Sequence, residues 1–73
     1  MFKSFTALIR REDDMYVSFC TELDIASQGS TVQEARENLR EAIELFLECA
    51  DPEEVKLRMH DEQYISSLEV AIG

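Results

Sequence analysis

Apolar and polar residues alternate in two neighbouring segments near the start of the chain. The odd-numbered positions of these segments carry most of the apolar side chains, which are Phe5, Ala7, Ile9, Val17 and Phe19. Leu8 interrupts the pattern, and the acidic stretch 11–14 separates the two segments. Because a period of two is typical of a strand with one buried face, we predict an antiparallel hairpin. Its turn should lie near residues 12–14, and its odd-numbered side chains should face the core.

A shorter segment of small residues follows the hairpin. Ile25 and Ala26 precede polar residues and Gly29, so residues 25–29 form either a short third strand or an extended loop. We expect Gly29 to supply a backbone conformation that residues with a Cβ atom resist.

Residues 31–50 repeat apolar side chains every three or four positions, which is the period of an amphipathic helix. Thr31 and Glu34 have the spacing of a capping box, in which each side chain accepts a hydrogen bond from the other residue's amide. The apolar stripe consists of Val32, Ala35, Leu39, Ala42, Ile43, Phe46, Leu47 and Ala50. The opposite side carries Glu37, Glu41, Glu44 and Glu48, and Leu45 falls outside the stripe. Pro52 should end the helix near Asp51.

The remaining residues divide into a charged stretch and a second alternating segment. Residues 51–63 are weakly periodic and predict a loop, with a turn of helix around 53–57. Residues 64–73 place Leu68, Val70 and Ile72 on one face, which predicts a final strand that returns to the sheet. We therefore predict a single α+β domain over residues 1–73, with the order β-β-β-α-β. One long amphipathic helix should pack on one face of an antiparallel sheet, giving two layers.

The charge of the chain restricts its partners. Sixteen acidic and seven basic residues give a net charge of −9, which argues against direct contact with nucleic acid or with an anionic membrane. An acidic surface attracts a basic protein, or it serves only solubility. A domain of 73 residues buries only about 60% of its unfolded surface, which favours association with a partner chain. The N-terminus lacks the pattern of a secretory signal, so we expect a cytoplasmic protein with Cys20 and Cys49 reduced.

Few residues have the pattern of a catalytic or metal site. His60 is the only histidine and lies in a polar stretch, and neither cysteine has basic neighbours in sequence. We expect both cysteines to be partly buried packing residues, and we expect no catalytic residue, cofactor or metal. The alternative is a metal-dependent nuclease that uses Asp13, Asp14 or Asp24, which would require these carboxylates to converge.

The segment YVSFCTELDIASQGSTVQEARENLREAIELFLE resembles the HicB family of antitoxins. The family pattern is matched by Tyr16, Val17, Glu22, Leu23, Gln28, Gly29, Thr31, Glu34, Ala35, Ala42, Leu45 and Leu47. The first and last predicted strands are also similar to those of short members of the family, so the likeness covers nearly the whole chain. Thr21 stands where the family usually has proline.

The resemblance implies a fold related to a reduced ribonuclease H-like core and an antitoxin function. Typical HicB proteins occlude HicA, a small basic toxin that cleaves mRNA. Many members also carry a C-terminal DNA-binding segment, which we do not expect here after the last predicted strand. The candidates for a partner-facing surface are Glu37, Glu41, Glu44, Glu48 and Leu45. The alternative for the glutamates is a solvated helix face, and Leu45 is either an ordinary exposed leucine or a contact between copies of the chain. The alternative within the family is an orphan homo-oligomer, a dimer or tetramer without a toxin.

Overall fold

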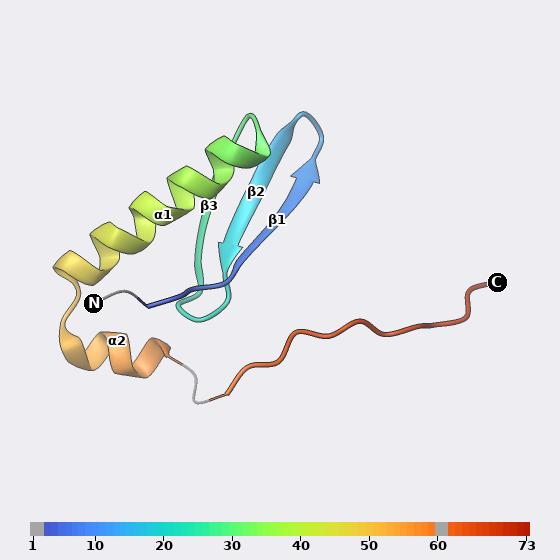
Figure 1. Cartoon of the computed structure of the whole chain (residues 1–73). Helices are drawn as coiled ribbons and strands as arrows, with labels where there is room; N and C mark the ends of the chain where they lie inside the picture. Colours follow the sequence, from blue (N-terminus) through green and yellow to red (C-terminus); the bar gives the residue numbers. More distant parts are fainter. Residues whose placement is uncertain (1–2, 60–61) are drawn as a thin grey trace.

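The computed structural model describes residues 3–59 and 62–73. Three strands come first, namely β1 (Ala7–Glu12), β2 (Met15–Cys20) and β3 (Ile25–Gly29). Two helices follow, α1 (Val32–Cys49) and α2 (Pro52–Arg58). Figure 1 shows α1 lying across one face of the sheet, so the two-layer α+β arrangement is confirmed.

The sheet is antiparallel and has the order β1-β2-β3. The β1–β2 turn contains only Asp13 and Asp14, since Glu12 pairs with Met15. Asp13 has a positive φ of 56°, a conformation that aspartate adopts more readily than most residues. The predicted hairpin and its turn are confirmed, and residues 25–29 form a strand rather than a loop.

The helix-facing side of β2 differs from the prediction. Its even-numbered residues Ser18 and Cys20 are fully buried, whereas Phe19 is exposed on the opposite face. The two-residue turn determines the register of β1 and β2. Paired residues have numbers that sum to 27, as Ile9 and Ser18 do. An odd-numbered residue of β1 therefore shares its face with an even-numbered residue of β2. In β1 the odd-numbered Ile9 is half-buried and the other residues are exposed, so the prediction holds there only at Ile9, and it is wrong for β2.

The core lies between α1, the end of β2 and the turn that follows β2. Its fully or almost fully buried apolar side chains are Cys20, Leu23, Ala35 and Leu39. Half-buried side chains surround this core, namely Phe5, Ile25, Ile43, Phe46 and Met59. The apolar stripe of α1 thus faces the sheet at its centre, but Val32 and Leu47 at its margins remain exposed.

The N-terminus of α1 is capped by neighbouring side chains. The Oγ1 atom of Thr31 accepts a hydrogen bond from the Glu34 amide at 3.0 Å. The Glu34 carboxylate accepts from the amide and hydroxyl of Ser30. Only the Thr31 half of the predicted capping box is therefore present, because the glutamate reaches one residue further back.

Gly29 is needed for a different reason from the one predicted. The φ angle of Gly29 lies outside the left-handed region, whereas Gly73 has a φ of 93°. A Cβ atom at position 29 would lie 2.5 Å from the Ala35 nitrogen and 2.8 Å from the Glu34 carbonyl carbon. Glycine therefore allows the backbones of β3 and α1 to approach closely.

The chain leaves α1 through Ala50 and Asp51 and forms α2. The Asp51 carboxylate caps α2 by accepting from the Glu53 amide at 2.8 Å, and Pro52 occupies the first turn. Arg58 then donates to the Leu23 carbonyl oxygen at 3.1 Å, and its guanidinium lies 4.8 Å from the centre of the Phe46 ring. These contacts fix α2 against the core. The predicted helical turn at 53–57 is confirmed and is slightly longer.

Residues 62–73 do not form the predicted final strand within this chain. They are extended but outside the sheet, and all of them are exposed. Figure 1 shows this segment, which we call the C-terminal arm, running away from the domain. Among the described residues, no strand of the chain forms backbone hydrogen bonds with the arm. The alternating apolar side chains of the arm are therefore not packed against the sheet.

Candidate functional site

The outer face of α1 is the predicted partner-facing surface. At about 100° per residue, its four glutamates fall within a stripe about 60° wide. Glu41, Glu44 and Glu48 are exposed, and Glu37 is half-buried. Leu39, which is buried, lies on the opposite side of the helix. The structure therefore places these acids on one solvent-facing stripe, about 16 Å long.

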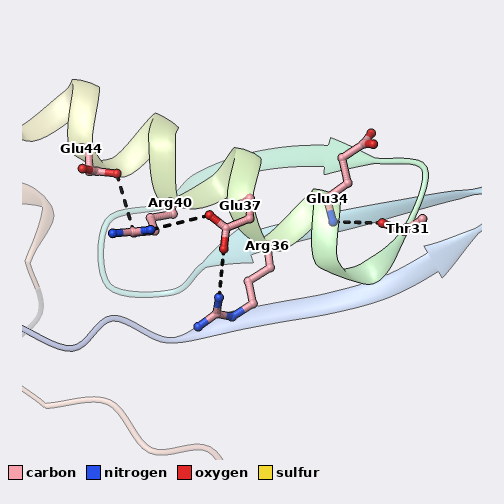
Figure 2. Close-up of polar contacts among 6 residues, drawn as sticks. All are labelled: Thr31, Glu34, Arg36, Glu37, Arg40 and Glu44. Atoms are coloured by element: carbon pink, nitrogen blue, oxygen red, sulfur yellow. Dashed lines mark hydrogen bonds and ion pairs between the residues drawn. The ribbon is translucent and has the colours of Figure 1, made fainter.

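Arginines on the same helix neutralise part of this stripe. Arg40 lies 3.6 Å from a Glu37 oxygen and 3.7 Å from a Glu44 oxygen, and Arg36 lies 3.3 Å from Glu37. Figure 2 shows this chain of ion pairs along the helix. Within the described part of the chain, Glu41 and Glu48 have no ion-pair partner. These two carboxylates are the most available charges for a second protein.

Leu45 adds an apolar side chain beside the acidic stripe. It is 61% exposed and follows Glu41 by one helical turn. An exposed leucine next to unpaired carboxylates can be buried by a partner that supplies both apolar and basic groups. The combination forms a candidate protein interface rather than a catalytic site.

Most residues of the HicB resemblance have structural contacts. The Asn38 side chain donates to the Gln28 carbonyl at 2.8 Å, and Ser18 donates to the Ala35 carbonyl at 2.8 Å. Leu23 is fully buried, and Tyr16 and Ala42 are half-buried. The contacts of Gln28, Gly29, Thr31 and Glu34 hold β3 and the following turn against α1.

Glu22 fastens the segment before β1 to the turn after β2. Its carboxylate accepts from the Thr6 amide at 2.9 Å and from the Thr6 hydroxyl at 2.7 Å. Partial burial opposes ionisation of Glu22, but the hydrogen bonds from Thr6 outweigh it and hold the pKa of this carboxyl below its usual value. An ionised Glu22 therefore stabilises the fold.

The acids considered for a nuclease lie apart. Asp13 and Asp14 form the turn before β2, whereas Asp24 lies after the other end of β2. A strand of six residues separates these positions by about 20 Å. Within residues 3–59 and 62–73, no three histidine, cysteine or acidic side chains are grouped so that they could hold a metal ion. His60 lies outside the described residues.

The cysteines occupy contrasting environments. Cys20 is fully buried in the core, Cys49 is exposed, and both are free thiols. The prediction that both are partly buried is therefore wrong. Burial raises the pKa of the Cys20 thiol, with weaker opposing effects from backbone hydrogen bonds. A raised pKa does not activate the Cys20 thiol as a nucleophile.

Two apolar surfaces were not predicted from the sequence. One is a groove of about 560 Å³ between the start of β1 and α1. Its apolar lining consists of Phe5, Ala7, Leu39, Ile43, Leu47, Val55 and Met59. The other is the uncovered face of the sheet, where Leu8, Phe19 and Ala26 lie side by side through the strand register. The interruption of the alternating pattern at Leu8 was the only signal of this second surface.

Comparisons with known proteins identify no relative. No family model matches this chain, and neither a curated protein nor a solved structure matches it significantly. A search of the helices in the described residues also found none with the length and apolar character needed to cross a membrane.

Proposed function

We propose that this chain is an antitoxin-like binding module of the HicB type, which neutralises a small basic mRNA-cleaving toxin of the HicA type by covering its surface. The observation that supports this most is the acidic outer stripe of α1 with its unpaired carboxylates Glu41 and Glu48. The net charge of −9 adds a long-range attraction for a basic partner. The protein would act in the cytoplasm, with mRNA as the target of its partner.

The proposed binding mode combines charge and apolar contact. Glu41 and Glu48 would pair with lysines or arginines of the toxin, and Leu45 would fill an apolar depression between them. Glu37 and Glu44 are already paired with Arg40, which leaves Glu41 and Glu48 as the carboxylates for the toxin. Occlusion of the toxin requires no reactive group in the antitoxin.

The proposal includes a more specific assignment of the fold. The described elements have the order β-β-β-α-α, and the first four are compatible with the start of a HicB-like arrangement and a reduced ribonuclease H-like core. An orphan homo-oligomer without a toxin is the second candidate. It is favoured by the two uncovered apolar surfaces at the groove and on the sheet.

Association kinetics with a HicA-type toxin would test the proposal. The toxin would come from a short basic reading frame beside the gene, and its arrest of growth should be relieved by co-expression of this chain. Glu41→Lys should lower the association rate roughly tenfold at about 10 mM ionic strength, and by much less at about 150 mM, where the Debye length falls from about 30 Å to about 8 Å.

Asp14→Lys is the matched control. It makes the same change in net charge on an exposed residue, but in the hairpin turn rather than on α1. It should affect the rate less than Glu41→Lys does. Equal effects of the two variants would show that α1 is not the contact surface, and a toxin that does not bind would refute the proposed function.

A further inference from the structure

The C-terminal arm has the pattern of a strand but no sheet. Leu68, Val70 and Ile72 alternate with Ser67, Glu69 and Ala71, and the three large apolar side chains are 74–95% exposed. Three such side chains at alternate positions form a continuous apolar edge on an extended segment. Isolated exposed apolar residues are common, but a row of this kind normally packs against something.

The backbone of the arm also lacks partners. Among residues 3–59 and 62–73, the only hydrogen bonds that involve the arm come from the Gln63 and Tyr64 side chains. Gln63 donates to the Thr21 carbonyl at 2.8 Å and holds the beginning of the arm at the end of β2. The backbone of 65–73 is therefore free to pair with a strand.

The groove beside β1 has the properties of a place for such a strand. In a two-layer domain, a fourth strand beside β1 would direct alternate side chains toward α1. The groove provides an apolar lining there through Leu39, Ile43 and Leu47 of α1 and Phe5 at the start of the sheet. The charged residues Lys3, Arg36, Arg40 and Glu44 also line the groove, and both arginines are already paired with glutamates of α1.

β1 is the more accessible edge of the sheet. It is the outermost strand on its side, and its residues are exposed except for the half-buried Ile9. On the opposite edge, the Gln28 carbonyl of β3 already accepts a hydrogen bond from Asn38 of α1. Figure 1 shows α1 lying nearer to β3 than to β1. An added strand therefore meets less obstruction at β1.

The dimensions of the single chain leave room for an interface of ordinary size. Its accessible surface is 6228 Å², whereas a folded monomer of 8.4 kDa exposes about 4,600 Å². Its radius of gyration is 14.4 Å, whereas a folded chain of this length has about 11 Å. The excess of roughly 1,600 Å² per chain is about twice the roughly 800 Å² that each partner contributes to an interface of standard size.

We infer that two copies of this chain exchange their C-terminal arms, and that the arm of each copy forms a fourth strand beside β1 of the other. Leu68, Val70 and Ile72 then fill the groove between β1 and α1 of the second copy. Figure 1 shows the arm extended and separate from the sheet of its own chain, as exchange requires. Reciprocal exchange closes a two-fold dimer, because each copy supplies one arm and one groove. This inference is independent of the proposed toxin.

The mass of the full chain in solution tests the inference. Light scattering after size exclusion should give twice 8.4 kDa. Val70→Asp should convert the dimer to a monomer, because it places a charge in the apolar groove. Ser67→Asp adds the same charge on the other face of the arm and should leave the dimer intact. The helical circular dichroism signal should be the same in both variants, because position 70 lies outside the folded domain.

Mixing two defective variants distinguishes exchanged arms from any other contact. Val70→Asp has a damaged arm and an intact groove, whereas Leu47→Asp has an intact arm and a damaged groove. Each should be monomeric alone, and the mixture should form a dimer through its one intact pair of arm and groove. A monomeric wild type, equal effects of Val70→Asp and Ser67→Asp, or a mixture that stays monomeric would overturn the inference. Dimeric mass only in the presence of another protein would also overturn it.

Discussion

Gly29→Ala gives a sharp test of how β3 and α1 are packed. In an ordinary strand this change is favourable, because alanine loses less conformational entropy on folding, and gains of about 0.4–1 kcal/mol are typical. Here the new Cβ atom would lie 2.5 Å from the Ala35 nitrogen. The obstacle is helix backbone, which cannot turn aside as a flexible side chain can.

The expected cost follows from the required displacement. Ordinary contact needs a separation of 3.4–4 Å, so α1 would have to move by about 1 Å. Overpacking of this kind costs about 1–3 kcal/mol, which exceeds the entropic gain. A net loss of about 1–2 kcal/mol lowers the melting temperature of a domain of this size by roughly 5–15 °C. Movement of α1 would also weaken the hydrogen bond from Ser18 to the Ala35 carbonyl, which is 2.8 Å long.

Thermal unfolding followed by circular dichroism would measure the effect. All variants should be compared at one protein concentration, because association would shift the melting temperature. Gln28→Ala is the control, since its exposed side chain belongs to the same strand. It should change the melting temperature by only a few degrees. A higher melting temperature for Gly29→Ala than for the wild type would refute the close approach of β3 to α1.

Three further predictions concern Glu22, the thiols and the helix cap. The folded-state pKa of Glu22 lies below its ordinary value of 4.5, so this carboxylate adds stability that is present above about pH 4.5 and lost as the pH falls through the folded-state value. Urea unfolding should therefore show a smaller loss of stability on acidification for Glu22→Gln than for the wild type, and parallel pH profiles would argue against the contact with Thr6. A thiol reagent should modify Cys49 rapidly and Cys20 only in denaturant, whereas two equally fast thiols would contradict the burial of Cys20. Thr31→Ala should lower the free energy of unfolding by about 1 kcal/mol through loss of the cap, and an unchanged value in urea would show that the hydroxyl does not cap α1.

The local pattern of the sequence was sufficient to predict the main elements. The period of two and the acidic turn located the hairpin, and the spacing of Ala35, Leu39 and Ile43 located the long helix. Pro52 placed the end of that helix correctly, since α1 ends at Cys49. These features depend on near neighbours in the chain, which is why the pattern alone reveals them.

The features that depend on distant residues could not be predicted in the same way. The face of β2 that is buried depends on whether the turn has an even or odd number of residues, and the sequence of the turn did not determine this. The reason for Gly29 is the position of Ala35 in space rather than the conformation of Gly29 itself. The prediction of a strand over residues 64–73 was wrong within this chain, because an alternating pattern does not specify a sheet for the segment to join. The same holds for the acidic stripe of α1, whose glutamates were predicted but whose pairing with Arg36 and Arg40 depends on the side-chain geometry.

Hydrogen exchange of the C-terminal arm would test most directly whether this fold is completed by a second copy. The full chain would be measured by mass spectrometry over a range of concentrations, following the peptide that covers residues 64–73. Arm exchange predicts slow amide exchange in this peptide at high concentration and fast exchange after dilution to the monomer. Fast exchange at every concentration would show that the arm stays free. Slow exchange in a particle with the mass of one chain would show that the arm pairs with its own sheet, and either result would contradict the account.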